Sequence, residues 1–289
     1  MKNDFRYEIK FVANEMNYSI FNEWFFSQSD FFKSYPERQI NSLYFDDNDF
    51  TSVKDNLSGV ANRKKIRLRW YGNNTQNKNN PILEIKNKNG RLGSKEHIKI
   101  PSLQNNIYEC KIQKIKEIIF DESTLNDYLS NKDFHPSLIV SYRRKYFENN
   151  ENIRITLDSD ISFSEPLYNK KITNHEKLYF NKRIIELKFS MDKKISASRL
   201  IKDLDLVPSR HSKYLTGLAM FGKVNYLWIH KMILNRNIFQ NLALYFYAFS
   251  LNFESIDILG RGLEGTFSFS RLAGLLYLVL ILPSFLIFF

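Results

Sequence analysis

Charged and apolar residues alternate along several short stretches of this chain, and such alternation is typical of β-strands. Successive side chains of a strand point to opposite faces of the sheet, so each stretch has one mostly cationic face and one apolar face. In the KKIRLRW stretch, for example, Lys65, Arg67 and Arg69 share one face, and Ile66 and Leu68 share the other. The alternation predicts seven strands of this kind, at residues 6–10, 65–69, 84–88, 95–99, 141–145, 154–158 and 186–188.

The cationic faces of these strands are compatible with two architectures. An antiparallel sheet with one solvated face is the usual cause of such alternation. A closed barrel would instead turn the cationic faces inward, toward one lumen, and bury the apolar faces under helices packed outside. We favour the barrel because like charges on neighbouring strands repel one another unless an anion lies between them. The pattern therefore predicts a tunnel for a polyanion with bound metal.

Other stretches complete the list of expected elements. Apolar residues at helical spacing predict four helices, the first with Asn14 as its cap, at residues 14–26, 108–120, 196–204 and 212–223. The turn signal Asn89-Gly90 predicts a hairpin between the strands at 82–88 and 95–100. Further strand boundaries are expected at 5–12, 41–46, 62–71, 138–148, 153–163 and 183–190. Strands dominate and helices are inserted between them, which predicts an α+β fold.

Composition narrows the class of partner. The chain has 289 residues and a formal net charge of +11, which indicates an anionic partner such as nucleic acid, phospholipid or a phosphate polymer. Cys110 is the single cysteine, so neither a disulfide framework nor a cysteine-based metal site is expected. The first residues enter a strand-like stretch directly, and no signal peptide is predicted.

The composition changes near residue 224, where long uncharged stretches begin. Residues 272–289 form an uncharged stretch of eighteen residues, which as a helix would span about 27 Å, close to the hydrocarbon core of a bilayer. Residues 238–253 form a weaker second candidate. The alternative interpretation is a buried helix of a soluble protein. The sequence predicts a domain at 1–223 and a membrane-associated tail at 224–289, with flanking cations that place the first domain in the cytoplasm.

Motifs along the first domain resemble one known family. RYEIKFV, NSLYFDD, KKIRLRWYG, ILEIKNKNG with SKEHI, VSYRRKYFE with IRITLD, IIELKF and HSKYLTG occur in the order seen in VTC domains, from residue 5 to about residue 223. VTC domains are polyphosphate polymerase domains of the triphosphate tunnel (CYTH-like) superfamily. The resemblance implies an antiparallel eight-stranded tunnel barrel. It also implies transfer of the γ-phosphate of a nucleoside triphosphate such as ATP to a growing polyphosphate chain, with Mn²⁺ or Mg²⁺ as cofactor.

The resemblance also implies a role for particular residues. The phosphate-binding tunnel would contain Lys10, Arg67, Arg69, Lys86, Lys95, Arg143, Arg154 and Lys213. Glu186 is the implied metal ligand, and Glu8 is a second candidate. Either Lys95 or Lys88 could face the phosphates, because the hairpin between them is short. Tyr142 and Tyr146 have the opposite parity to Arg143 and are therefore expected in the core, and Asp46-Asp47 is expected to form a turn.

Two other functions remain open at this stage. A tunnel hydrolase that cleaves triphosphate would have the same lumen, and a non-catalytic polyphosphate sensor would keep the cations without turnover. Nucleic acid is the poorer partner because aromatic residues are not interleaved with the basic residues on one strand face. The last fifty or so residues weakly resemble the start of an O-antigen ligase or polymerase-type membrane protein. We therefore expect attachment to the inner membrane, with the catalytic domain in the cytoplasm.

Overall fold

The computed structural model describes residues 6–72, 80–89, 92–104, 107–121 and 133–224. The chain divides into two units, Met1–Asn225 and Tyr226–Phe289, and the described residues all lie in the first. Among the described residues no helix is long and apolar enough to cross a membrane. The predicted spans at 238–253 and 272–289, and the resemblance of the tail to a ligase-type membrane protein, fall outside the described residues.

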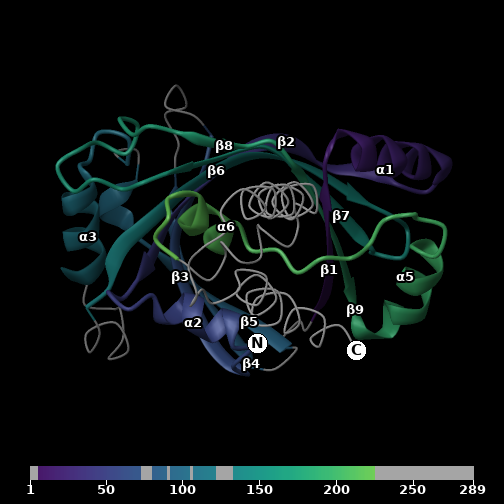
Figure 1. Cartoon of the computed structure of the whole chain (residues 1–289), viewed down its shortest axis with the longest axis horizontal. Coiled ribbons are helices and arrows are strands. Elements are labelled where there is room, and N and C mark those ends of the chain that lie inside the picture. Colours follow the sequence, from purple (N-terminus) through teal and green to yellow (C-terminus); the bar gives the residue numbers. More distant parts are fainter. Residues whose placement is uncertain (1–5, 73–79, 90–91, 105–106, 122–132, 225–289) are drawn as a thin grey trace, which may run out of the picture. The chain divides into compact units, whose positions relative to one another are not determined.

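The first unit is built on one antiparallel sheet, whose strands follow the order β1-β9-β7-β6-β2-β3-β4-β5, with β8 paired to β7 (Figure 1). All pairings between the described strands are antiparallel, as the family resemblance implied. The strands are β1 (Arg6–Ala13), β2 (Phe32–Asp46), β3 (Asn62–Tyr71), β4 (Ile82–Asn89), β5 (Leu92–Lys99), β6 (His135–Glu148), β7 (Arg154–Ser164), β8 (Leu178–Phe180) and β9 (Arg183–Ser190).

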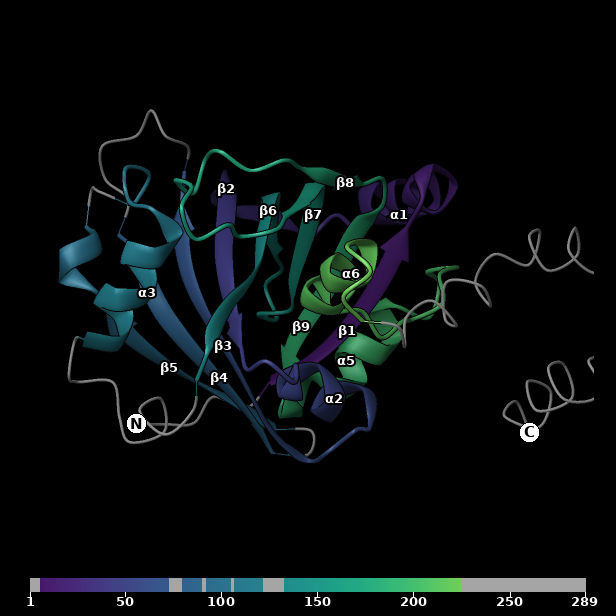
Figure 2. The same ribbon diagram turned by 60° about the vertical axis from the view of Figure 1, so that its left-hand side comes forward.

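The sheet is strongly curved but is not closed by hydrogen bonds. Its two edge strands are β1 and β5, and no hydrogen-bonded ladder joins them among the described residues. The expected eight-stranded closed barrel is therefore corrected to a nine-stranded open sheet. Figure 2 shows the strands curling round one side, so that the sheet has an inner, concave face and an outer face.

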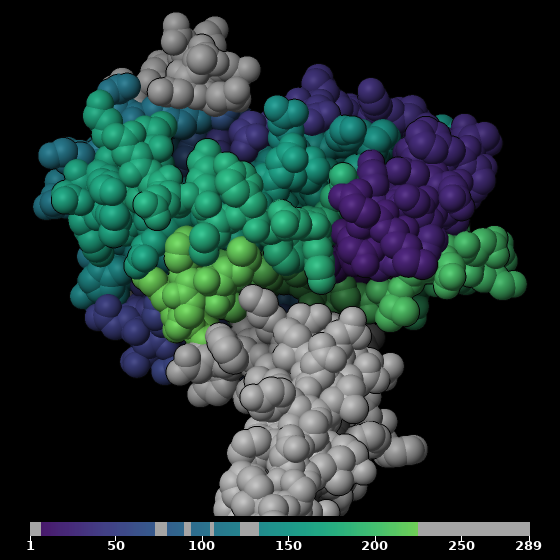
Figure 3. Space-filling model, turned by 45° about the horizontal axis from the view of Figure 1, so that its top comes forward, coloured from purple at the N-terminus to yellow at the C-terminus, as the bar shows by residue number. Residues whose placement is uncertain are grey.

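The outer face is covered by helices at two places. The first group of helices, η1 (Pro101–Leu103) and α3 (Ile112–Asp121), packs on the apolar side of β2 to β4 through residues such as Leu43, Leu68 and Ile115. The second group, α1 (Glu15–Ser27) and α5 (Lys194–Leu200), covers β1, β7 and β9, where Trp24 and Leu187 are buried. Figures 1 and 3 show α1, in purple, at the surface of the molecule. Burying both apolar stripes explains the alternation in the sequence.

One helix lies on the inner face. Helix α6 (Lys213–Met220) packs against β6 and β7, and Figures 1 and 2 show it within the curve of the sheet. The Tyr214 hydroxyl donates to Asp46 at 2.7 Å, and a Cβ added at Gly217 would lie 2.5 Å from Leu138 Cδ2. This close approach requires a glycine. The expectation that all helices pack outside the sheet is corrected by α6.

The predicted elements agree with the structure in most places. The helix at 14–26 is confirmed as α1, and Asn14 caps it by accepting a hydrogen bond from the Asn17 amide at 2.8 Å. The predicted strand at 41–46 is the end of the much longer β2. Four elements were not predicted, namely η1, α2 (Thr51–Leu57), η2 (Met191–Lys193) and β8. Asp47 was expected only in a turn, but its side chain also accepts a hydrogen bond from the Thr51 amide, in the first turn of α2.

Candidate functional site

The inner face collects charged side chains from most of the sheet and from α6. Register and alternation place them together: Lys10 is paired with Glu186, Lys65 with Lys86, Arg67 with Glu84, and Lys86 with Lys95. The cations include Lys10, Lys65, Arg67, Arg69, Lys86, Lys95, Arg144, Lys188 and Lys213, and the carboxylates include Glu8, Glu84, Asp158 and Glu186. This surface, called the inner face below, therefore has a large excess of positive charge.

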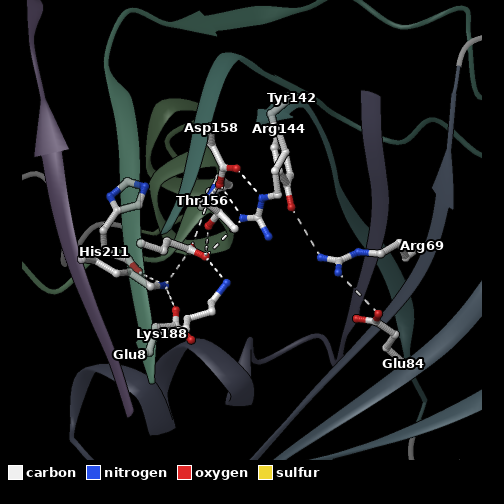
Figure 4. Close-up of polar contacts among 12 residues, drawn as sticks. Glu8, Arg69, Glu84, Tyr142, Arg144, Thr156, Asp158, Lys188 and His211 are labelled. Atoms are coloured by element: carbon white, nitrogen blue, oxygen red, sulfur yellow. Dashed lines mark hydrogen bonds and ion pairs between the residues drawn. The ribbon is translucent and has the colours of Figure 1, made fainter. Parts of the chain in front are cut away.

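Glu186, on β9, is the centre of one group of ion pairs, which includes Arg144 and Lys188, both labelled in Figure 4. Its carboxylate lies 2.6 Å from Lys188, 3.2 Å from Arg144, 3.5 Å from Lys10 and 3.8 Å from Lys213. Burial alone would raise the pKa of Glu186, but these four cations outweigh it and hold the pKa well below its usual value. Glu186 is therefore a carboxylate at neutral pH.

Asp158, on β7, forms the second part of this group. The Arg144 guanidinium donates to both carboxylate oxygens of Asp158, and Lys213 Nζ donates to Oδ2. Asp158 is fully buried, and burial would raise its pKa, but Arg144 and Lys213 lower it. A buried carboxylate held by two cations fixes the positions of both cations. Asp158 thus orients Arg144 on the sheet and Lys213 on α6 toward the same space.

A second group of ion pairs lies on β3 and β4. Glu84 accepts from Arg67 Nε at 2.7 Å and from Arg69 Nη1 at 3.4 Å, and these arginines lower the pKa of Glu84 to about 2 against the effect of burial. Arg67 also donates to the Tyr44 hydroxyl at 3.1 Å. Arg69 Nη2 donates to the Tyr142 hydroxyl at 3.5 Å, which links this group to Arg144, as Figure 4 shows.

Three lysines, on β3, β4 and β5, form no ion pair with a carboxylate within the part of the chain that the structure describes. Burial, together with the neighbouring charges of Lys86 and Lys10, lowers the pKa of Lys65 to about 7. Burial also lowers the pKa of Lys86, and burial together with Arg67 lowers that of Lys95 to about 8. Crowded ammonium groups of this kind are stabilised by an anion bound between them. The positive charge of the lysines and arginines on the inner face thus exceeds the negative charge of its carboxylates.

The carboxylates Glu8 and Glu186 fit a divalent ion that arrives with a phosphate ligand. Both contact Lys10, at 2.9 Å and 3.5 Å, so their oxygens lie near one another. Burial would raise the pKa of Glu8, but Lys10 and other lysines lower it to about 2, so Glu8 is ionised too. No group of three or more acidic, histidine or cysteine ligands occurs among the described residues. Two carboxylates plus phosphate oxygens are a common donor set for Mg²⁺, whereas all-protein cages are unusual for this ion.

Comparison with known proteins gives the family of the chain. The VTC domain family matches residues 5–222. This chain belongs to the VTC domain family. A relative, the vacuolar transporter chaperone complex subunit 2 of Saccharomyces cerevisiae, is 23% identical over 236 residues. The match covers 62% of this chain and 28% of the yeast protein, so this chain spans a small part of that relative.

Two solved structures are similar to this VTC domain at low identity. A putative adenylate cyclase from Vibrio parahaemolyticus has a TM-score of 0.42 and 14% identity, and the match covers 74% of this chain and 99% of that chain. A putative adenylyl cyclase from Hippeastrum, described as having a dominant triphosphatase activity, has a TM-score of 0.44 and 12% identity. That match covers 74% of this chain and 95% of the other.

The structure of the VTC domain brings most of the residues singled out from the sequence together. The inner face holds Glu8, Lys10, Arg67, Arg69, Lys86, Lys95, Glu186 and Lys213. Lys88 lies on the same side as Lys95, since Lys86 pairs with Lys95 and Lys88 follows Lys86 by two residues. Arg154 also has this parity, but it is paired with Glu148 at 3.0 Å at the start of β7.

Arg143 is the exception among these residues. Its side chain is 60% exposed and lies 3.6 Å from Asp160 and 3.9 Å from Glu37, on the outer side of β6. Its neighbour Arg144 instead occupies the inner face, with Tyr142 and Tyr146 on the same side of the strand. These two tyrosines are opposite in parity to Arg143, as expected, but this parity is the inner face, so the expectation that they lie in the core beneath the helices is corrected. In the SYRRKYF motif cations occur at both parities, so the alternation alone does not say which arginine points inward.

The predicted phosphate-binding and metal-binding residues did not include several other residues of the inner face. Lys65, Glu84 and Asp158 share a strand face with Arg67, Lys86 and Thr156, respectively. The alternation alone would therefore have predicted that they belong to the inner face. Lys188 had the same signal, two residues after Glu186. No sequence pattern predicted the contact of Tyr44 with Arg67, because this contact depends on the register between β2 and β3.

Proposed function

We propose that this VTC domain is a polyphosphate polymerase that transfers the γ-phosphate of ATP to a growing polyphosphate chain, in a metal-dependent reaction. The observation that supports the proposal is the excess of buried or half-buried cations over carboxylates on the inner face. Such a surface lacks counter-charges for Lys65 and Lys86, and a phosphate chain supplies them at regular intervals. Membership of the VTC domain family adds the polymer as the specific anion.

The inner face can orient a triphosphate for transfer. Arg67 and Arg69 lie two residues apart on β3, and their forked guanidinium groups can donate to adjacent phosphates. Arg144, fixed by Asp158, can do the same from β6. Lys86 and Lys213 act as point charges from β4 and α6. Phosphoryl transfer needs mainly such positioning and neutralisation of charge, so no serine or cysteine nucleophile is required.

The reaction itself balances without a covalent intermediate on the protein. An oxygen of the terminal phosphate of the polymer attacks the γ-phosphorus of ATP. The bond between the γ-phosphorus and the β–γ bridging oxygen breaks, and ADP leaves. Glu8 and Glu186 would hold a Mg²⁺ or Mn²⁺ ion, which would supply charge neutralisation on the phosphate oxygens. Arg67 and Arg144 would neutralise the remaining charge as it shifts to ADP.

Attachment to a membrane is part of the proposal. The apolar stretches at 238–253 and 272–289 would anchor the chain and leave the VTC domain in the cytoplasm, at an inner membrane. Fractionation of cells that express the full chain tests this part independently of the chemistry. Recovery of the chain in the soluble fraction would reject the anchor without affecting the assignment of the inner face.

The experiment that tests the activity is product analysis with the full chain, ATP and Mn²⁺. Electrophoresis detects polymer, and a phosphate assay on the same sample detects hydrolysis. The proposal predicts polymer and ADP with little free phosphate. Free phosphate or triphosphate without polymer would show that water is the acceptor, which is the tunnel hydrolase. Tight binding of polyphosphate with no turnover would show a sensor.

A further inference from the structure

An arginine surrounded by three tyrosines lies beyond the ion pairs described above. The Arg38 guanidinium carbon is 5.5 Å from the centre of the Tyr35 ring, 5.1 Å from that of Tyr71 and 5.0 Å from that of Tyr146. These residues come from three neighbouring strands, β2, β3 and β6. We call Tyr35, Arg38, Tyr71 and Tyr146 the Arg38 cage.

The Arg38 cage belongs to the inner face. Arg38 is the register partner of Arg144, and paired residues of neighbouring strands point to the same side of a sheet. Tyr71 follows Arg69 by two residues on β3, and Tyr146 follows Arg144 by two residues on β6. Two residues of a strand span roughly 7 Å. The cage therefore continues the phosphate-binding surface, one step further along β3 and β6.

The chemistry of the Arg38 cage differs from that of the rest of the inner face. It presents one cation and three neutral rings instead of crowded cations and carboxylates. The Tyr35 ring is 52% exposed and so offers a flat, accessible surface. Arg38 Nε is buried and has no hydrogen-bond partner among the described residues. An exposed ring beside a planar guanidinium suits a flat, aromatic ligand that can stack on it.

We propose that the Arg38 cage binds the nucleobase of the nucleoside triphosphate. This inference rests on the proposed function, because it assumes that the phosphates of the same molecule lie on Arg69 and Arg144. The ribose would bridge the step between these arginines and the cage. The base stacks on the exposed Tyr35 ring, beside the Arg38 guanidinium. Stacking tolerates any base, so the cage does not select one purine strictly. It prefers purines over pyrimidines because the purine ring system offers a larger stacking surface.

The test compares a ligand that has a base with one that lacks it. Calorimetric titration of the full chain with ATP and with inorganic tripolyphosphate, both without divalent ions, measures binding and avoids turnover. Tyr35→Ala is predicted to weaken ATP binding about tenfold, the effect of losing one stacked base contact. The affinity for tripolyphosphate should change less than twofold, because Tyr35 carries no charge. Tyr35→Phe should retain wild-type affinity for ATP.

A matched control is available on another strand. Tyr179, on β8, is also exposed and lies outside the cage, so Tyr179→Ala should leave both affinities unchanged. Arg38→Lys keeps the charge but removes the planar group, and it should weaken ATP binding more than tripolyphosphate binding. CTP should lose less affinity than ATP in Tyr35→Ala.

Three other results would overturn either the cage proposal or the proposed function. An equal loss for both ligands in Tyr35→Ala and Arg38→Lys would show that the cage contacts the phosphate chain, which overturns the proposal. Unchanged ATP binding in both variants would show that the cage only stabilises the sheet, which also overturns it. In both cases the proposed function would stand. A wild-type chain that binds neither ATP nor tripolyphosphate would instead reject the proposed function itself.

Discussion

The guanidinium of Arg144 and the carboxylate of Asp158 face each other across β6 and β7 and are joined by two hydrogen bonds. The same guanidinium donates to Glu186 on the next strand at 3.2 Å. One arginine thus connects the carboxylates of two strands while its adjacent residue, Arg143, lies on the outer side of β6. This arrangement determines which arginine of the SYRRKYF motif faces the inner side of the sheet.

The two neighbouring arginines should therefore respond differently to removal. Arg144→Ala leaves Asp158 buried with Lys213 alone, and we expect it to lower the free energy of unfolding by about 3 kcal/mol. Arg143→Ala breaks only exposed ion pairs and should cost about 0–1 kcal/mol. Urea denaturation of the full chain, followed by tryptophan fluorescence, measures both changes. Similar costs for the two variants would contradict the placement of Arg144.

Lys65 is expected to oppose folding and to support binding. Burial and the neighbouring Lys86 disfavour its charge in the ligand-free protein, so Lys65→Met should raise the melting temperature. The same substitution should weaken tripolyphosphate binding at least about tenfold, since one charge-assisted hydrogen bond is lost. The control is Lys145→Met, on the exposed outer side of β6, which should change neither quantity. A variant that is less stable and binds normally would contradict this interpretation of Lys65.

The affinity for triphosphate should fall as the pH rises above neutrality. Burial lowers the pKa of Lys65 to about 7 and that of Lys95 to about 8 in the ligand-free protein. Bound phosphate favours the ammonium form and raises both pKa values, so binding takes up protons above pH 7 and takes up almost none well below it. Calorimetry between pH 7 and pH 9, in buffers of different ionisation enthalpy, measures this uptake. An affinity that does not change over this range would contradict the prediction, and Lys65→Met should remove the part of the uptake near pH 7.

Glu186 and Glu84 offer a matched pair for the metal site. Both are buried carboxylates held by arginines. Only Glu186 shares an ion-pair partner, Lys10, with the second candidate ligand Glu8. Glu186→Gln should raise the Mn²⁺ concentration needed for half-maximal activity at least about tenfold, since even indirect partners of metal ligands contribute that much. Glu84→Gln should leave this concentration nearly unchanged. Equal Mn²⁺ requirements in the two variants would show that Glu186 is not a ligand.

Much of the sheet was predictable because its two faces differ so strongly. Runs such as KIRLRW and IELK have apolar residues at every second position, and burial of those residues fixes which side is cationic. Asn14 and the Asn89-Gly90 turn gave correct local signals for α1 and for the hairpin of β4 and β5. Lys10, Arg67 and Glu186 could therefore be grouped before any coordinates were known.

The remaining features depend on contacts between distant residues. The choice of Arg144 over Arg143 depends on the pairing with Asp158, and a bulge in the β6–β7 register breaks the simple alternation nearby. The Arg38 cage lies where the register of β2 with β6 shifts twice, so no periodic pattern points to it. The place of α6 inside the sheet depends on the fit of Gly217 against Leu138.

The most direct test of the account follows the γ-phosphate itself. Full chain is incubated with γ-labelled ATP and Mn²⁺, and label in polymer is measured for the wild type, for Lys86→Ala and for Lys145→Ala. Lys86 lies on the inner face and forms no ion pair among the described residues, so its removal leaves no carboxylate without a partner, and Lys145 is exposed on the outer face. The account predicts that wild type and Lys145→Ala move label into polymer, and that Lys86→Ala loses transfer while keeping its melting temperature. Undiminished transfer in Lys86→Ala, or label found only in free phosphate, would contradict it.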